Sequence, residues 1–96
     1  MLSGELEGAF ARNSEVRWTE MDGDTVVLDT ERNAYFGLGG IGSRIWELLA
    51  EPITVEEISS SIQAEFDIDP KRCEEDVIHF LNELSTHDII RRCSAT

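Results

Sequence analysis

Three short segments in the first half of the chain have strand-like patterns: apolar and polar residues alternate at residues 16–21, residues 25–29 are β-branched and apolar, and residues 34–38 are aromatic and apolar. A two-residue period is typical of a strand with one buried face. Asp22-Gly23-Asp24 separates the first two segments and predicts a tight hairpin turn, because Asp and Gly tolerate positive φ angles. The polar residues 30–33 predict a second turn. The pattern therefore predicts a three-stranded antiparallel meander with residues 34–38 at an edge.

In the second half, apolar residues recur at the three- and four-residue spacing of amphipathic helices. Thr54 and Glu57 have the spacing of a capping box, which marks the start of a helix. Asp69 and Pro70 have the pattern of an N-cap followed by proline at the first helical position. The predicted helices run from Gly39-Gly40 or Gly42-Ser43 to Glu51, from Val55 to Phe66, and from Pro70 to Ser85 or Thr86.

Strands followed by helices in a chain of 96 residues predict one α+β domain with its helices on one face of a small sheet. Short helices joined by tight turns favour a winged helix-turn-helix-like arrangement. We expect the folded domain to cover residues 14–92, with flexible tails at residues 1–13 and 93–96. The apolar pair Ile89-Ile90 is expected to form a short strand or a segment packed on the core.

The formal net charge of −12 argues against several partners. Twenty acidic residues against eight basic ones create a field that repels nucleic acid and anionic membranes. No apolar run approaches the roughly 20 residues that span a bilayer, and Glu5 and Glu7 lie where a secretory signal would be basic or apolar. Cys73 and Cys93 are expected as reduced thiols. These features predict a cytoplasmic protein with neither nucleic acid nor membrane as a partner.

The reactive residues match no catalytic or metal-binding motif. His79 and His87 are eight residues apart, which places them about 12 Å apart along a helix, too far to share a metal ion. Cys73 and His79 would lie on nearly opposite sides of that helix. We therefore expect a protein that is not an enzyme and that uses no metal or cofactor.

Two other functions fit parts of the sequence. Residues 38–45 resemble the motif around the phosphopantetheine serine of peptidyl carrier proteins, which makes Ser43 a candidate attachment site. However, an extra residue separates the glycine pair from Ser43, and predicted strands precede it where carriers have a helix. The other alternative is a winged-helix DNA-binding regulator, but four acidic residues against two basic ones on the third helix oppose phosphate contacts.

Four segments, in order, resemble the PqqD-like family of RiPP recognition elements. They are Tyr-Phe-Gly-Leu at residues 35–38, Ile-Trp-Glu-Leu-Leu at 45–49, Thr-Val-Glu-Glu-Ile at 54–58, and Asp-Val-Ile-His-Phe-Leu-Asn-Glu-Leu at 76–84. The match extends over residues 14–92. The chain departs from the family at Leu38-Gly39, where Leu-Asn is usual, and this affects the turn after the third strand.

The resemblance implies a domain that has no active site and binds the leader segment of a ribosomally synthesised precursor peptide. Such proteins pass the leader to modifying enzymes. A short, acidic, free-standing chain is most similar to the discrete recognition protein of a lasso-peptide pathway, which works beside a leader peptidase and a cyclase.

The predicted sheet indicates how a leader would bind. An edge strand offers unpaired N–H and C=O groups to which an extended peptide can add, and the third helix can supply one wall of an adjacent groove. Trp46 lies off the apolar stripe of the first helix and is expected either in the core or at an interface with a partner enzyme. The candidate leader-binding residues are Asn33, Ala34, Tyr35, Phe36, Gly37, Leu38, Asp76, Val77, Phe80, Leu81 and Leu84.

Overall fold

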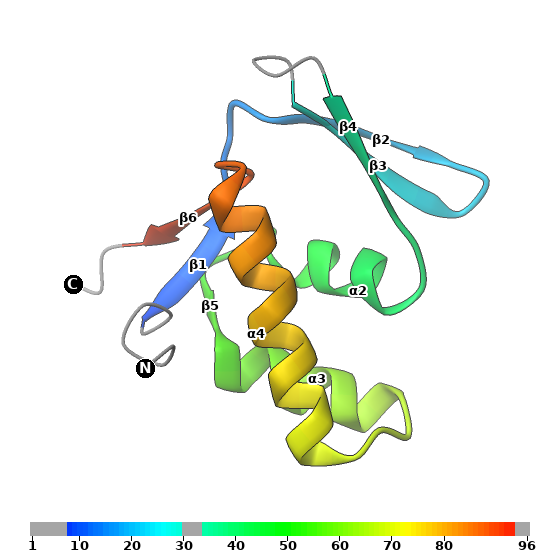
Figure 1. The fold of residues 1–96 in the computed structure, drawn as a ribbon, viewed down its shortest axis with the longest axis vertical. Helices are drawn as coiled ribbons and strands as arrows, with labels where there is room; N and C mark the ends of the chain where they lie inside the picture. Colours follow the sequence, from blue (N-terminus) through cyan, green and yellow to red (C-terminus); the bar gives the residue numbers. More distant parts are fainter. Residues whose placement is uncertain (1–7, 30–33, 94–96) are drawn as a thin grey trace.

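The computed structural model describes residues 8–29 and 34–93. Figure 1 shows a strand meander at one end of the molecule and helices packed below it toward the other end. The α+β class and the order of a meander followed by three helices are as predicted. The elements are β1 (Ala9–Arg12), β2 (Arg17–Met21), β3 (Asp24–Asp29), β4 (Ala34–Leu38), α2 (Ile41–Leu48), β5 (Ile53–Thr54), α3 (Val55–Glu65), α4 (Pro70–Thr86) and β6 (Ile90–Cys93).

The meander is an antiparallel sheet in the order β2-β3-β4. Its first hairpin turns at Asp22, with a φ of 54°, and Gly23, with a φ of 86°, which are the left-handed angles that an Asp-Gly turn requires. Thr25, Val27 and Asp29 of β3 are buried on one face, which we call the inner face. Leu28 is exposed on the opposite, outer face. The predicted turn at residues 30–33 lies outside the described residues.

A second sheet, in the order β5-β1-β6, was not predicted. Residues 9–12 differ from the expected flexible tail because they form β1, which pairs with β6 from Ala9↔Cys93 to Arg12↔Ile90. Phe10 of β1 is 2% exposed and belongs to the core. Cys93 likewise lies in a strand and not in a tail. The partners of β1 are β5 from the middle of the chain and β6 from its other end, so the local pattern could not indicate them.

Two helices start at the predicted caps. Thr54 Oγ1 accepts a hydrogen bond from the Glu57 amide at 3.1 Å, and the Glu57 carboxylate accepts one from the Thr54 amide at 3.0 Å. Asp69 accepts a hydrogen bond from the Arg72 amide at 3.1 Å, and Pro70 is the first residue of α4. Each of these caps satisfies a backbone amide that has no partner within its own helix.

The first helix, α2, starts at Ile41, which is between the two predicted starts. Gly40 precedes it with a φ of 53°, an angle that a side chain would make costly. The glycine therefore allows the chain to leave β4 and enter α2 within two residues.

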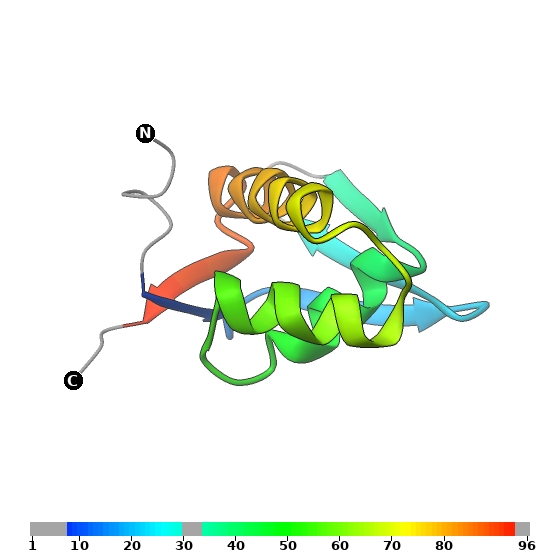
Figure 2. The ribbon, with the colours of Figure 1, turned by 90° about the horizontal axis from the view of Figure 1, so that it is seen from below.

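One hydrophobic core joins both sheets and all three helices. Figure 2 shows α3 and α4 side by side, and their apolar faces meet in this core. The buried apolar residues are Phe10, Val27, Leu38, Ile45, Trp46, Leu49, Ile58, Ile62, Cys73, Val77, Leu81, Leu84, Ile89 and Ile90.

Candidate peptide-binding site

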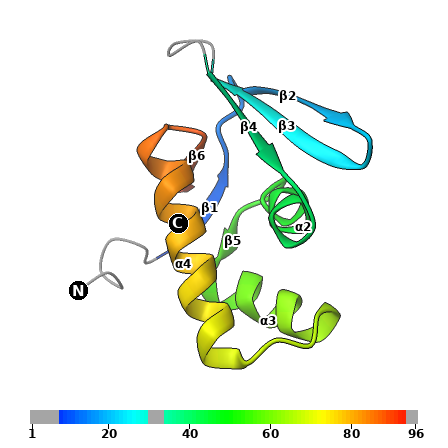
Figure 3. The same cartoon turned by 45° about the vertical axis from the view of Figure 1, so that its right-hand side comes forward.

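Among the described residues, β4 is an edge strand that pairs with β3 and has no strand on its other side. Figure 3 shows β4 on the side of the meander toward α4, with β2 farther from that helix. The Phe36 ring on β4 lies 4.6 Å, centroid to centroid, from the ring of His87, the C-cap residue of α4. The edge that was predicted to accept a peptide therefore lies beside α4.

A mainly apolar cavity of about 230 Å³ opens between α2, α3 and α4. Gly42 connects it to the end of β4, because a β-carbon at Gly42 would lie 3.5 Å from the Phe80 ring and 3.8 Å from Leu38 Cβ. The cavity has room for one large apolar side chain of a peptide lying along β4. It is lined by Ile41, Gly42, Ile45, Ile62, Ile68, Cys73, Asp76, Val77 and Phe80.

The predicted site residues on β4 have very different exposures. Tyr35 is 74% exposed, whereas Leu38 is 7% exposed and belongs to the core. Phe36 is partly buried on the inner face, and Gly37 is exposed. Ala34 pairs with Asp29 of β3, and Asn33 lies outside the described residues. Tyr35 and Gly37 are therefore exposed positions of the strand, whereas Leu38 packs in the core and holds the end of the strand in place.

The predicted site residues on α4 fall into two groups. Asp76, Val77 and Phe80 line the cavity. Leu81 is 0% exposed and Leu84 is 3% exposed, and neither lines it. The structure therefore places Asp76 and Phe80 at the candidate groove and Leu81 and Leu84 in the core, while Val77, which is 2% exposed, belongs to the core and also lines the cavity.

Several lining residues were not among the predicted site residues. Ile41 and Ile45 belong to the apolar stripe of the first helix, and Ile62 belongs to that of the second. Ile68 follows α3 in the connection to α4 and is partly buried. Gly42 could have been suspected from its place beside the strand-to-helix turn, but its proximity to Phe80 depends on how α2 and α4 pack.

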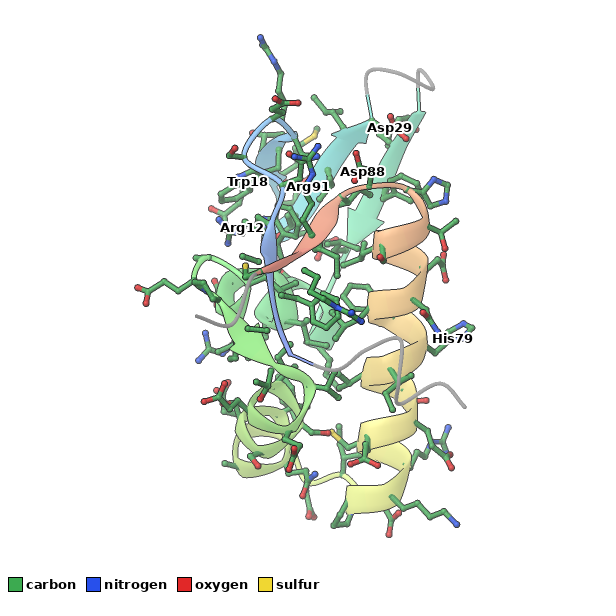
Figure 4. All side chains as sticks on the ribbon, turned by 90° about the vertical axis from the view of Figure 1, so that its left-hand side faces the viewer. Arg12, Trp18, Asp29, His79, Asp88 and Arg91 are labelled. Carbon is green, nitrogen blue, oxygen red and sulfur yellow. The ribbon has the colours of Figure 1, made fainter. Side chains whose placement is uncertain are left out.

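Trp46 is a core residue, being 1% exposed, so the core alternative predicted for it is correct. Its ring makes an edge contact with Trp18 of β2, with centroids 5.9 Å apart. The Arg12 guanidinium lies 4.7 Å from both indole rings and donates two hydrogen bonds to the Trp46 carbonyl. Figure 4 shows Arg12 and Trp18 next to each other. This cluster fixes β1 and β2 against α2, away from the cavity.

Ser43, the candidate attachment site of a carrier protein, lies in the first turn of α2. Its hydroxyl is 2.7 Å from the hydroxyl of Thr25, which is buried on the inner face of the meander. A serine at this position is therefore explained by the hydrogen bond that it forms between α2 and the sheet. His79, by contrast, projects outward from α4 (Figure 4) and lies 3.8 Å from Glu83.

A salt bridge near the site connects α2 to α3. Arg44 of α2 donates hydrogen bonds to Glu65 of α3 at 2.8 and 3.0 Å and to Glu47 at 3.0 Å. The hydrogen bond from Arg44 lowers the pKa of Glu65, and the same contacts raise the pKa of Arg44. Among residues 8–29 and 34–93, no group of three His, Cys, Asp or Glu side chains is arranged to hold a metal ion.

Comparisons with known proteins identify the family and the fold. A profile of the PqqD family, described as coenzyme PQQ synthesis protein D, matches residues 24–90. The structure of TbiB1 in complex with the TbiA(beta) leader peptide matches with a TM-score of 0.77 and 33% identity, over 88% of this chain and 99% of that one. A lasso peptide synthetase B1 complexed with the leader peptide matches with a TM-score of 0.75 and 17% identity, over 85% and 96%. No curated protein matches the sequence.

The fold and the site thus define a small α+β domain with an open sheet edge beside an apolar cavity. The chain belongs to the PqqD family. This confirms the resemblance seen in the four sequence segments. The part of the chain that the structure describes contains no helix with the length and hydrophobicity needed to cross a membrane.

Proposed function

We propose that this protein binds the leader segment of a ribosomally synthesised precursor peptide, in a lasso-peptide pathway, and delivers it to the leader peptidase or cyclase. The protein acts as a non-catalytic adaptor in the cytoplasm. The leader adds as a strand to the open edge of β4 and places an apolar side chain in the cavity between α2, α3 and α4. The supporting observation is this pairing of edge and cavity in a chain 33% identical to a protein solved with a leader peptide.

The free-energy terms show why both parts of the site are needed. Each added backbone hydrogen bond contributes about 0.5–1.5 kcal/mol, while ordering each residue of a flexible leader costs about 1–2 kcal/mol. Strand addition alone is therefore weak and insensitive to sequence. Burial of one large apolar side chain adds about 1.5–3 kcal/mol. Two such anchors would bring the dissociation constant to about micromolar.

We assign separate roles to the candidate residues. The backbone groups of β4 that point away from β3 pair with the leader, and these belong either to Tyr35 and Gly37 or to Ala34 and Phe36. Val77 and Phe80 form the apolar wall, and Asp76, which is 72% exposed, lies at the rim. Leu38, Leu81 and Leu84 support the site from the core and do not contact the leader side chain.

Titration of the full-length protein with a fluorescently labelled precursor leader tests this proposal. We expect saturable binding near micromolar concentration, and no binding of the labelled core segment of the same precursor. Equal affinity for leader and core, or binding of neither, would contradict the proposal. Two further assays address the alternatives: mass spectrometry after treatment with a phosphopantetheinyl transferase tests Ser43, and a gel shift tests DNA binding.

A further inference from the structure

The exposed large hydrophobic side chains of the described residues all lie on the meander. They are Trp18, Met21, Leu28 and Tyr35, with exposures of 41%, 59%, 37% and 74%. Trp18 is on the inner face, where it contacts Trp46. The other three are on the outer face, because their cross-strand partners are outer-face residues. An apolar patch of this kind on a small soluble domain marks an interaction surface.

Strand pairing arranges the outer face in continuous rows. Arg17, Leu28 and Tyr35 are direct neighbours across the three strands. Thr19, Val26 and Gly37 form the next row. In Figures 1 and 3 the three helices lie on the other side of the sheet. No helix of the described residues therefore covers the outer face, where Met21, Val26, Leu28 and Tyr35 lie among Arg17, Thr19 and Asp24.

Gly37 is a second, independent indication. A β-carbon at this position would meet no atom within 4 Å, and the backbone has no positive φ. A glycine inside a strand is unfavourable by about 0.5–1 kcal/mol relative to alanine, so nothing within the described protein requires it. A glycine in a strand often marks a place where another backbone or a ligand approaches closely. Here it leaves a gap in the outer face beside Tyr35.

We propose that the outer face of β2-β3-β4, centred on Met21, Leu28 and Tyr35, is the docking surface for the enzyme that receives the leader. This inference rests on the proposed function. A leader strand added to β4 would point alternate side chains to the outer face, next to Tyr35 and Gly37. The receiving enzyme would then contact one continuous surface made by both the protein and its bound leader.

The charge distribution specifies the partner. On the outer face, Arg17 and Asp24 balance each other, whereas Glu15 and Asp22 lie exposed at the two ends of the meander. The docking surface of the enzyme should therefore be apolar at its centre and basic at its rim. A second copy of this chain is a poorer occupant, because two molecules with a net charge of −12 repel each other.

A composite surface couples the two binding events. If the enzyme contacts both the outer face and the bound leader, each ligand strengthens the binding of the other by the same factor. The protein without leader should then bind the enzyme more weakly than the complex does. The adaptor would in this way favour enzyme engagement after a precursor has been captured.

The double variant Met21→Ser/Leu28→Ser tests the docking surface without altering β4 or the cavity. The probe is the purified leader peptidase of the same pathway, with the full-length adaptor and labelled precursor. We expect leader affinity to stay within about twofold of wild type, while the KM of the peptidase for the adaptor–precursor complex rises at least about tenfold. His79→Ser, on the exposed side of α4, is the matched control and should change neither value. The melting temperature of each variant verifies the fold.

Three outcomes would overturn this inference. An unchanged KM would place the enzyme elsewhere on the adaptor. A parallel loss of leader affinity would make the outer face part of the leader site. A wild-type dimer in analytical ultracentrifugation that the double variant abolishes would make it an interface between copies. Failure of the proposed function would be distinguishable from failure of this inference, because the wild-type protein would then bind no leader.

Discussion

The rings of Phe36 and His87 lie 4.6 Å apart at an angle of 60°, and this contact joins the middle of the edge strand β4 to the C-terminus of α4. His87 also lies 4.0 Å from the buried Asp29 of the neighbouring strand. The meander is thus held at one end by the C-cap of α4 and at the other by the passage from Leu38 into α2. Between these two points β4 keeps its open edge beside the helix that lines the cavity.

Replacing Phe80 should reduce leader binding more than it reduces stability. Phe80 is partly buried and lines the cavity, so Phe80→Ala removes contact area for a bound side chain. We expect the dissociation constant for the leader to rise about 10- to 100-fold, as burial of one large side chain predicts. Fluorescence anisotropy measures the affinity, and thermal melting measures the loss of stability. His79→Ala on the same helix should leave the affinity unchanged, and equal binding by folded Phe80→Ala would refute the groove.

Proline substitutions should identify the edge that accepts the leader. Successive amides of a strand point to opposite edges, so Tyr35 and Gly37 share one edge and Phe36 donates at the other. Proline removes the amide donor. The variants are Tyr35→Pro, Gly37→Pro and Phe36→Pro. A proline that removes a donor to β3 should disturb the sheet, whereas a proline at the open edge should leave the circular dichroism spectrum unchanged. A variant with the wild-type spectrum has therefore lost an open-edge donor and should not bind the leader. A folded proline variant with wild-type affinity would show that the leader does not pair with β4.

Leu81 should behave as a core residue. It is 0% exposed, and Leu81→Ala should lower the free energy of unfolding by about 2–5 kcal/mol through lost burial and an unfilled space. Denaturant unfolding gives this value. Leader affinity, corrected for the folded fraction, should stay within about twofold of wild type. A large loss of affinity in the folded fraction would instead place Leu81 in the leader groove.

The bond between Arg44 and Glu65 should make stability depend on acidic pH. Its hydrogen bond lowers the pKa of Glu65 in the folded state, so the folded protein binds a proton here less readily than the unfolded chain. The stabilising contribution is present above the pKa of Glu65 in the unfolded chain and is lost as the pH falls through its folded pKa. We expect Glu65→Gln to melt at a lower temperature than wild type at pH 7. The difference should narrow on acidification, and a difference that stays constant down to pH 3 would contradict the assignment.

Much of the fold could be predicted because its signals are local. The Asp22-Gly23 turn, the Thr54 capping box and the Asp69-Pro70 start each depend on a few neighbouring residues, and the structure has each of them. The strand β1 shows the limit of such signals. Phe10 is the one large apolar residue of residues 9–12, and its strand is stabilised by pairing with β6 from the other end of the chain.

The candidate site was predictable to a similar extent. Apolar periodicity indicated that Val77, Phe80, Leu81 and Leu84 share a face of α4. The periodicity could not show which of these residues line the cavity and which lie only in the core. The apolar face is wide enough to pack on the core along one side and to line the cavity along the other. Only the positions of α2 and α3 determine that Phe80 borders the cavity and Leu81 does not.

The sequence by itself determined the order of strands and helices, their caps and turns, the acidic charge and the family. Three further features depend on tertiary contacts: the second sheet around β1, the division of the α4 face between core and cavity, and the uncovered outer face of the meander. The physical reason is that turns, caps and periodicity depend on interactions between near neighbours. Burial and strand pairing depend on residues that only the folded chain brings together.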